Sequence, residues 1–426
     1  MIKKTKRKKV IHCNLSEVYT SVAFCPGVVV IIHAPKSCSH IVYNAWLNSK
    51  RKMLLKYKGI IPNVEDNLFM TCMTDKEAIF GGEKLLERSV ETVLKEKNPK
   101  CIIVVSGCAA AVIGDDVQSV CNKLEEKYNV PIIFIPGSGF MSDQTRDGLL
   151  LSTKYLYKKF VDVGDKEKDD KLALILGLNK FQLLEWEFAE LERIYKYFGY
   201  EKLLIAPCGM SIEELSRINK AAFIAFYVPT MEKFREYNKF ASELSQVLNV
   251  PQVGKRMPLS IEATYEYINS MGILLGKEKQ AEEALDKERR ILSECIEKHK
   301  DNFIGKGCAI ALGHPLKFTN LKEVFYILRS IGFTINKVLL LNDLTDAEIC
   351  EYQDCITSME PELPAIVEND FDNNKDNDDV YITSIFNDKL KRQFVFRRKR
   401  IGIGGVKVFL EKLSAMILNN RSLGHE

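Results

Sequence analysis

Hydrophobic positions follow two patterns that alternate along the chain. Runs of five or six consecutive apolar, mostly β-branched residues are separated by stretches in which apolar residues recur every three or four positions. The first runs are Val28–His33, Cys101–Val105 and Pro131–Ile135, and periodic stretches follow the second and third runs at 112–127 and 142–160. Buried strands that alternate with amphipathic helices are typical of parallel sheets covered by helices.

The alternation restarts twice after polar interruptions. The charged segment Asp162–Lys171 precedes a second group, and a third group begins near Gly305. Their expected strands are 172–176, 203–206, 223–228, 308–312, 337–341 and 364–367, and two long helices are expected at 231–248 and 261–298, with a break near Gly276. We therefore predict an α/β protein of three Rossmann-like, doubly wound parallel-sheet domains, at residues 1–165, 166–304 and 305–426.

Length and charge exclude several classes of protein. A chain of 426 residues is too long for one core, and 61 basic against 57 acidic residues is too balanced for a dedicated nucleic-acid binder. The basic residues at positions 3–9 are interpreted as a solvated tail. No apolar run approaches the ~18–20 residues of a membrane span, and the N-terminus lacks the apolar segment of a signal peptide. We expect a cytoplasmic protein with no membrane or nucleic-acid partner.

Nucleotide-binding motifs are missing although the fold class would suit them. The sequence contains no GxxxxGK[ST] motif and no GxGxxG motif after a strand. Gly402, Gly404 and Gly405 form a single GxGG, which we interpret as a turn. A P-loop ATPase or a classical dinucleotide site is therefore disfavoured.

Twelve cysteines are the chemically distinctive feature, and none of them forms a CxxC pair. In a reducing compartment most are expected to be buried or incidental thiols, and those within apolar strands or helical periods are Cys101, Cys121, Cys295, Cys308, Cys350 and Cys355. Cys208 follows a strand and is either a ligand or a turn residue. Cys38 and Cys108 directly follow strands, where doubly wound sheets bind ligands, and Cys13 precedes a helical stretch. Such thiolates suit an iron–sulfur cluster, although residues alone leave a cluster-free protein open.

Three spaced blocks resemble the nitrogenase component 1 family. In that family a cysteine precedes an H-G-x-x-x-C turn by about 25 residues; here Cys13 precedes His33–Cys38 (HAPKSC), with Ala34 in place of the usual glycine. Met73–Glu83 resembles the family's acidic stretch that ends in F-G-G, and Ser106–Asp116 resembles its T-C-x-x-x-x-I-G-D-D block. The order and spacing of the blocks agree, and weaker likeness continues through 209–230 and 305–342.

The resemblance implies a site and a partner. Cys13, Cys38 and Cys108 match the three cysteines that hold an iron–sulfur cluster at a subunit interface, either [4Fe–4S] or a larger, P-cluster-like one. Three ligands from one chain leave the cluster incomplete, so a partner subunit is expected to supply the rest. Ser142 stands where some β-type subunits place a serine near the cluster, and its more ordinary role would be to cap the following helix.

Two further motif features carry structural expectations. Gly81 and Gly82 are expected to allow a close backbone approach or a tight helix start. Gly114–Asp116 is expected to cap the helix that follows Cys108, with carboxylates near its positive end.

The amino-acid sequences of the second and third blocks are more similar to those of β-type than of α-type subunits. The α-type subunit carries a cofactor-binding cysteine after a middle-domain strand, where this chain has Tyr227 and Val228. We therefore interpret the chain as a β-type subunit of a nitrogenase-like reductase. It would relay electrons from an ATP-dependent iron–sulfur reductase to an active site in an α-type partner. A scaffold subunit for metal-cofactor assembly and a subunit of a tetrapyrrole-reducing relative remain the alternatives.

Overall fold

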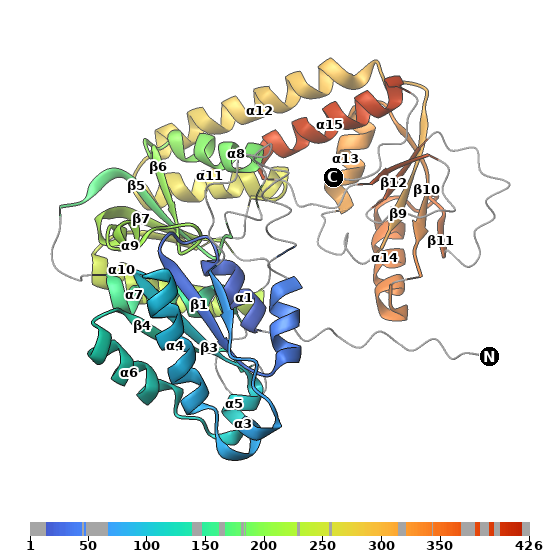
Figure 1. The fold of residues 1–426 in the computed structure, drawn as a ribbon. Coiled ribbons are helices and arrows are strands. Elements are labelled where there is room, and N and C mark those ends of the chain that lie inside the picture. Colours follow the sequence, from blue (N-terminus) through green and yellow to red (C-terminus); the bar gives the residue numbers. More distant parts are fainter. Residues whose placement is uncertain are drawn as a thin grey trace, which may run out of the picture. The chain divides into compact units, whose positions relative to one another are not determined.

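The computed structural model describes most of the chain, in two compact units at 1–256 and 257–426 (Figure 1). The described residues are 14–44, 47, 67–138, 147–161, 167–179, 183, 185–227, 231–254, 258–313, 321–342, 344–367, 380–383, 392–395 and 401–419. Within them the strands form three sheets, all parallel, so the predicted α/β class is confirmed.

The first sheet carries the predicted site at one edge. Its strands are β1 (Val28–His33), β2 (Leu68–Met70), β3 (Cys101–Ser106) and β4 (Ile132–Pro136), in the spatial order β2-β1-β3-β4. The direction of winding reverses between β1 and β3, and the crevice at such a reversal is where open α/β sheets bind ligands.

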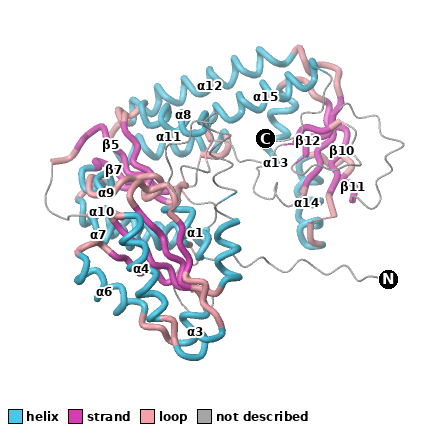
Figure 2. The backbone as a smooth tube through the Cα atoms, in the orientation of Figure 1, coloured by secondary structure: helices cyan, strands magenta, loops and turns pink. Residues whose placement is uncertain are grey.

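Helices cover both faces of this sheet, and successive residues of a strand point to opposite faces. Val29 and Ile31 pack with α4 (Glu83–Lys97) and α6 (Val117–Tyr128), whereas the next residues along β1 pack with α1 (Asn14–Val22) and α7 (Gly148–Phe160). Every residue of β1 and β3 is buried, which explains why these strands read as continuous apolar runs. Figure 2 shows the helices, in cyan, around the strands, in magenta.

The second sheet belongs to the same compact unit and has the same winding. Its order is β6-β5-β7-β8, from β5 (Asp169–Leu176), β6 (Lys202–Ile205), β7 (Ala221–Phe226) and β8 (Gln252–Gly254). Its helices are α8 (Glu185–Lys196), α9 (Ile212–Leu215), the 3₁₀ turn Ile218–Lys220 and α10 (Met231–Leu248). One apolar cluster runs from α1 and α7 to β5, β7 and α10, so the two sheets share a core.

The second compact unit holds the third sheet. Its order is β11-β10-β9-β12-β13, from β9 (Gly307–Leu312), β10 (Thr334–Leu340), β11 (Ala365–Val367), β12 (Val380–Thr383) and β13 (Gln393–Val395). Its helices are α11 (Ile261–Leu275), α12 (Glu278–Lys300), α13 (Leu321–Ser330), α14 (Asp346–Met359) and α15 (Gly402–Asn419). The break expected near Gly276 is confirmed, because that residue ends α11 with a φ of 61°.

Helices α11 and α12 lie within the predicted middle domain, residues 166–304. In the structure they pack against α15, which lies within the predicted C-terminal domain, residues 305–426. The backbone N–H of Gly402 also donates to the carbonyl of Pro258 at 2.8 Å. The three sheets match the three predicted α/β groups in number and order, while the three-domain boundaries at 165 and 304 stay a prediction. No helix among the described residues is long and apolar enough to cross a membrane.

The GxGG segment is a helix start and not the predicted turn. Gly402, Gly404 and Gly405 lie in the first turns of α15, whose residues Ile403 and Val406 are buried in the core of the second unit. Tertiary packing of this apolar helix therefore outweighs the low helix propensity of glycine.

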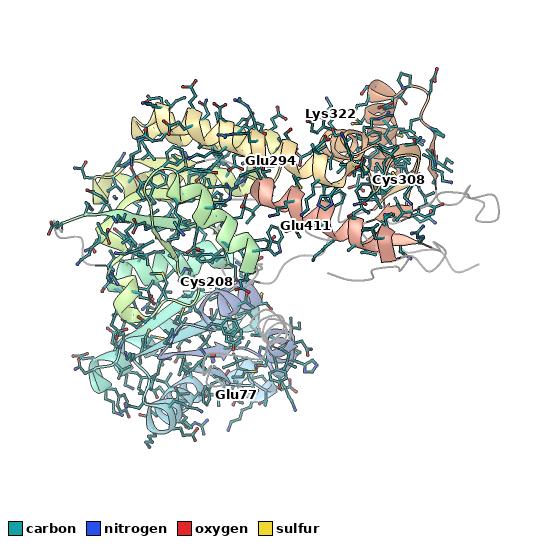
Figure 3. The ribbon with its side chains drawn as sticks, turned by 90° about the horizontal axis from the view of Figure 1, so that it is seen from above. Glu77, Cys208, Glu294, Cys308, Lys322 and Glu411 are labelled. Carbon is teal, nitrogen blue, oxygen red and sulfur yellow. The ribbon has the colours of Figure 1, made fainter. Side chains whose placement is uncertain are left out.

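His299 on α12 is a buried ionisable group in this unit. Its side chain is 7% exposed, and its Nε2 atom has no hydrogen-bond partner among the described residues. Burial lowers the pKa of His299, with Lys298 acting in the same direction and Glu411 of α15 opposing them. Figure 3 shows Glu411 on α15.

We expect His299 to make this protein less stable at acidic pH. Because its folded-state pKa lies below its unfolded value, the unfolded chain binds more protons and stability falls as pH drops below about 6.5. His299→Leu should therefore flatten the fall in thermal unfolding midpoint between pH 8 and pH 5. An equal fall in both proteins would contradict this expectation.

Candidate functional site

Two of the predicted ligands follow neighbouring strands at the winding reversal. β1 and β3 pair in parallel register up to His33 opposite Ser106, and the Gly107 N–H donates to the His33 carbonyl at 2.9 Å. The chain after β1 enters a helical segment at 36–44 that carries Cys38, and the chain after β3 enters α5 (Cys108–Ile113). Cys38 and Cys108 therefore follow the carboxyl ends of two paired strands of the first sheet.

Cys13 lies outside the described residues, but the chain immediately after it is well anchored. Helix α1 begins at Asn14 and packs on α7, where Glu17 Oε2 accepts from the Gly148 N–H at 2.9 Å. The hydroxyls of Ser21 and Ser152 are 2.8 Å apart and strengthen the same contact.

The three cysteine-bearing segments converge at one point. A Cβ atom placed on Gly107 would lie 2.8 Å from the Cβ of Ala34 and 3.6 Å from Cδ1 of Leu15. Gly107 precedes Cys108, Ala34 is four residues before Cys38, and Leu15 is two residues after Cys13. Segments far apart in sequence thus approach within van der Waals distance beside the predicted ligands.

Accessibility separates these thiols from most of the others. Cys38 and Cys108 are partly exposed, and Cys25, Cys101, Cys121, Cys208, Cys295 and Cys308 are buried. Burial raises the pKa of Cys25 and of Cys121 to about 12, so these two thiols stay protonated at neutral pH. The expectation of buried or helix-surface cysteines is confirmed for Cys101, Cys121, Cys295, Cys308, Cys350 and Cys355.

The donor chemistry of Cys38 and Cys108 is compatible with an iron–sulfur cluster, because thiolates are the ligands that such clusters require. Among the described residues, no three His, Cys, Asp or Glu side chains are grouped to hold one metal ion. A cluster instead distributes its thiolate ligands over several iron atoms, which suits thiols carried by separate loops. Cys38 and Cys108, together with Cys13 outside the described residues, are the residues that would hold it.

The three sequence blocks meet around the buried ring of His33. Its Nε2 lies 3.0 Å from Oδ2 of Asp115, and its Nδ1 lies 3.2 Å from the hydroxyl of Thr71. Asp115 Oδ1 also accepts from the Gly82 N–H at 2.8 Å. Burial lowers the pKa of His33, and Asp115 opposes that shift, so we treat the ring as neutral at pH 7.

Gly82 is a glycine because the ring and the carboxylate leave no room for a side chain. A Cβ there would lie 2.7 Å from Asp115 Oδ2 and 2.8 Å from His33 Cε1. Gly81, with a φ of 86°, ends α3 (Asp75–Phe80), whose Glu77 closes a capping box with Thr74. The expected close backbone approach at the F-G-G block is confirmed.

The predicted capping by the third block is correct for one residue. Asp116 Oδ1 accepts from the Ser119 N–H at 3.0 Å and caps α6. Asp115 instead turns toward His33, because Gly114, with a φ of 79°, divides the single helix expected at 112–127 into α5 and α6.

Ser142 lies outside the described residues. The helix expected to start there begins at Gly148, and Asp147 caps it by accepting from the Leu150 N–H at 2.9 Å. The capping role suggested for Ser142 therefore belongs to Asp147.

Among the described residues, no accessible cysteine lies at the winding reversal of the second sheet, between β5 and β7. Tyr227, which follows β7 where the resemblance places an α-type cofactor cysteine, is 1% exposed and lies 2.7 Å from the hydroxyl of Tyr195. A Cβ on Gly177 would lie 2.4 Å from the Tyr227 carbonyl oxygen, so the two strand ends are tightly packed. Cys208, which Figure 3 labels, lies in a turn after β6, as the second of its two predicted roles requires, and it is buried.

Sequence reasoning missed Cys72 as a thiol of the same sheet edge. It follows β2, is exposed, and its Sγ lies 4.0 Å from the hydroxyl of Ser39. Its position after a strand was a usable signal, but β2 has only three residues and was not recognised as a strand.

A cavity of about 490 Å³ lies elsewhere on the first sheet. Its walls come from α6, the edge strand β4 and α7, including Asn122, Phe134, Tyr155 and Lys158. None of the predicted ligands lines it, so we do not connect it with the cysteine site.

Comparison with known proteins agrees with this architecture. The model of the nitrogenase component 1 type oxidoreductase family matches residues 22–370, and the chain belongs to that family. Nitrogenase Cp1 at pH 5 shares its fold, with a TM-score of 0.60 at 16% identity over 98% of this chain and 91% of that chain.

Two relatives illustrate the range of roles within the family. The nitrogenase iron-molybdenum cofactor biosynthesis protein NifE of Clostridium pasteurianum is 26% identical over 309 residues, 71% of this chain. The matched region spans 62% of that protein's length. The nitrogenase molybdenum-iron protein alpha chain of Methanosarcina barkeri is 20% identical over 67% of this chain and 52% of its own length. These relatives confirm the predicted family and do not support the finer prediction of a β-type subunit.

We expect the contact between Gly107 and Ala34 to be intolerant of one added methyl group. Gly107→Ala would press two Cβ atoms to 2.8 Å and should lower the free energy of unfolding by about 1–3 kcal/mol. Ala34→Gly in the same chain removes the opposing methyl group and should restore much of the loss. Chemical denaturation of the single and double variants checks this, and additive losses would contradict it.

Proposed function

We propose that this chain is the cluster-bearing, electron-relaying subunit of a nitrogenase-like reductase complex. Cys13, Cys38 and Cys108 hold an iron–sulfur cluster at a subunit interface, and an α-type partner completes its ligand set. An ATP-dependent iron–sulfur reductase delivers electrons, which pass to an active site in the partner. The convergence of Leu15, Ala34 and Gly107 carries this proposal, because it brings all three cysteine-bearing segments together.

The chain's own residues define a limited chemical task. When bound, an iron–sulfur cluster supplies low-potential one-electron transfer. The thiolates of Cys38 and Cys108 hold it at the sheet edge, while buried neighbours such as Leu15 and Ala34 keep water from one side. The buried, hydrogen-bonded Tyr227 supports an active site on the partner, since it replaces the α-type cofactor cysteine. We assign no general acid or base to this chain.

Exposed apolar side chains beside the site support a protein partner. Ile41 and Tyr43 are 56% and 44% exposed on the helical segment that carries Cys38. Ile79, Phe80 and Val112 are exposed on α3 and α5, which contact each other beside Cys108. Apolar surface of this kind is typical of interfaces.

A thiolate site also suits a reducing compartment, which is the cytoplasm.

A scaffold for metal-cofactor assembly is the second candidate. The observation that favours it is the similarity to proteins named for iron-molybdenum cofactor biosynthesis, of Clostridium pasteurianum and, at 24% identity over 289 residues, of Methanococcus maripaludis. A scaffold would use the same cysteine edge to hold a cluster, but it would pass its cargo to another protein.

The cluster is tested by anaerobic purification of the chain together with its partner. We expect a brown complex that contains iron and acid-labile sulfide. Cys38→Ser and Cys108→Ser should each lose most of the iron with an unchanged circular dichroism spectrum. Cys350→Ser is the matched control, because Cys350 is an exposed cysteine in the second unit. A colourless, iron-free complex would contradict both candidate functions.

Turnover separates the reductase from the scaffold. With the ATP-dependent reductase and ATP added, a reductase complex should reduce protons or acetylene, and Cys38→Ser should abolish this activity. A scaffold should instead show no sustained turnover, and it should activate a cofactor-free acceptor protein when the two are mixed.

A further inference from the structure

We propose that His33 is a positioning residue that fixes the Cys38 and Cys108 loops relative to one another and thereby tunes the bound cluster. This inference rests on the proposed function. It concerns a hydrogen-bonded ring that touches no ligand directly and acts through the segments around it.

The hydrogen bonds define the protonation of the ring. The Asp115 carboxylate accepts from Gly82 N–H at Oδ1 and lies 3.0 Å from the ring at Oδ2. Since a carboxylate only accepts, His33 Nε2 carries the proton and donates it to Asp115. Nδ1 is then an acceptor in the neutral ring, and the Thr71 hydroxyl lies 3.2 Å from it and 3.4 Å from the Ile32 carbonyl oxygen, so two acceptors share its single proton. Each nitrogen of this fully buried ring therefore has a hydrogen-bond partner within reach.

The ring connects the segment before Cys38 with the segment after Cys108. His33 ends β1 five residues before Cys38, and Asp115 comes seven residues after Cys108. The Asp115 N–H donates to the Ala110 carbonyl at 3.1 Å, so a shift of the carboxylate moves α5 with it. Thr71 directly follows β2, and the next residue along the chain is Cys72.

Tight packing makes the arrangement unable to absorb small changes. Gly82 lies against the ring and the carboxylate with no room for a Cβ atom. The Asp115 side chain is 2% exposed, so water does not replace a lost donor. Loss of the His33 donor is therefore expected to displace the α5 segment and with it the Cys108 thiolate. Cluster potentials respond to ligand placement and to nearby hydrogen bonds.

Two substitutions separate the hydrogen bonds from the bulk of the ring. His33→Phe keeps a ring and removes both hydrogen bonds, whereas His33→Gln retains an N–H that reaches Asp115. Asp116→Asn is the matched control, because Asp116 lies in the same block but caps α6 and does not bond to the ring.

The first measurement uses the anaerobic complex with its partner. We expect His33→Phe to lose at least half of the iron per chain or to hold a cluster with altered electron paramagnetic resonance g-values and a shifted midpoint potential. His33→Gln should return these properties toward wild type, and Asp116→Asn should match wild type. An iron-loaded His33→Phe complex with an unchanged spectrum and potential would overturn the inference alone, whereas an iron-free wild type removes the proposed function as well.

The second measurement needs no cluster and covers the case in which His33→Phe fails to assemble. In the cluster-free full-length chain, iodoacetamide alkylation of Cys38 and Cys108, followed by mass spectrometry, reports the placement of both thiols. Thr71→Val, which deletes one partner of the ring, should change these two rates several-fold and leave Cys350 unchanged. Unchanged rates at both loop cysteines would overturn the inference.

Discussion

The parallel pairing of β1 with β3 is the constraint on which the candidate site depends. Because the two strands end in register at His33 and Ser106, the loops that follow them begin at the same sheet edge. The winding of the sheet reverses between these strands, which is the position where open α/β sheets bind ligands. Two partly exposed thiols, Cys38 and Cys108, follow these strands, and the anchored start of α1 brings the segment after Cys13 to the same place.

Close packing then limits what can occupy this edge. Gly107 lies against Ala34, and Ala34 stands where the family usually has glycine. Because Gly107 has no side chain, there is room for the methyl group of Ala34. Gly82 likewise gives its space to His33 and Asp115. Interiors packed to crystal density transmit such contacts rigidly, which explains why residues without ligand chemistry still determine where the thiols lie.

Much of the fold and part of the site followed from sequence pattern. Fully apolar strands predict a parallel sheet that is buried on both faces, and β1, β3 and β9 were predicted for that reason. The three-residue strand β2 and the glycine-rich start of α15 were not recognised, because short elements and helices held by packing carry weak local signals. Because β2 was not recognised, Cys72 was not predicted to follow a strand. The third motif block also did not indicate that Asp115 would contact the His33 ring and not cap a helix.

The sequence by itself determined the α/β class, the alternation of most strands and helices, and the family, since periodicity and spaced motifs are properties of the linear chain. It also singled out Cys13, Cys38 and Cys108 as candidate ligands. Only the tertiary structure decided which thiols are accessible, that Cys208 and Tyr227 are buried, and that three motif blocks meet on one ring. Burial and hydrogen bonding depend on which strands become neighbours, and that pairing joins residues some 70 to 80 positions apart, beyond the reach of local pattern.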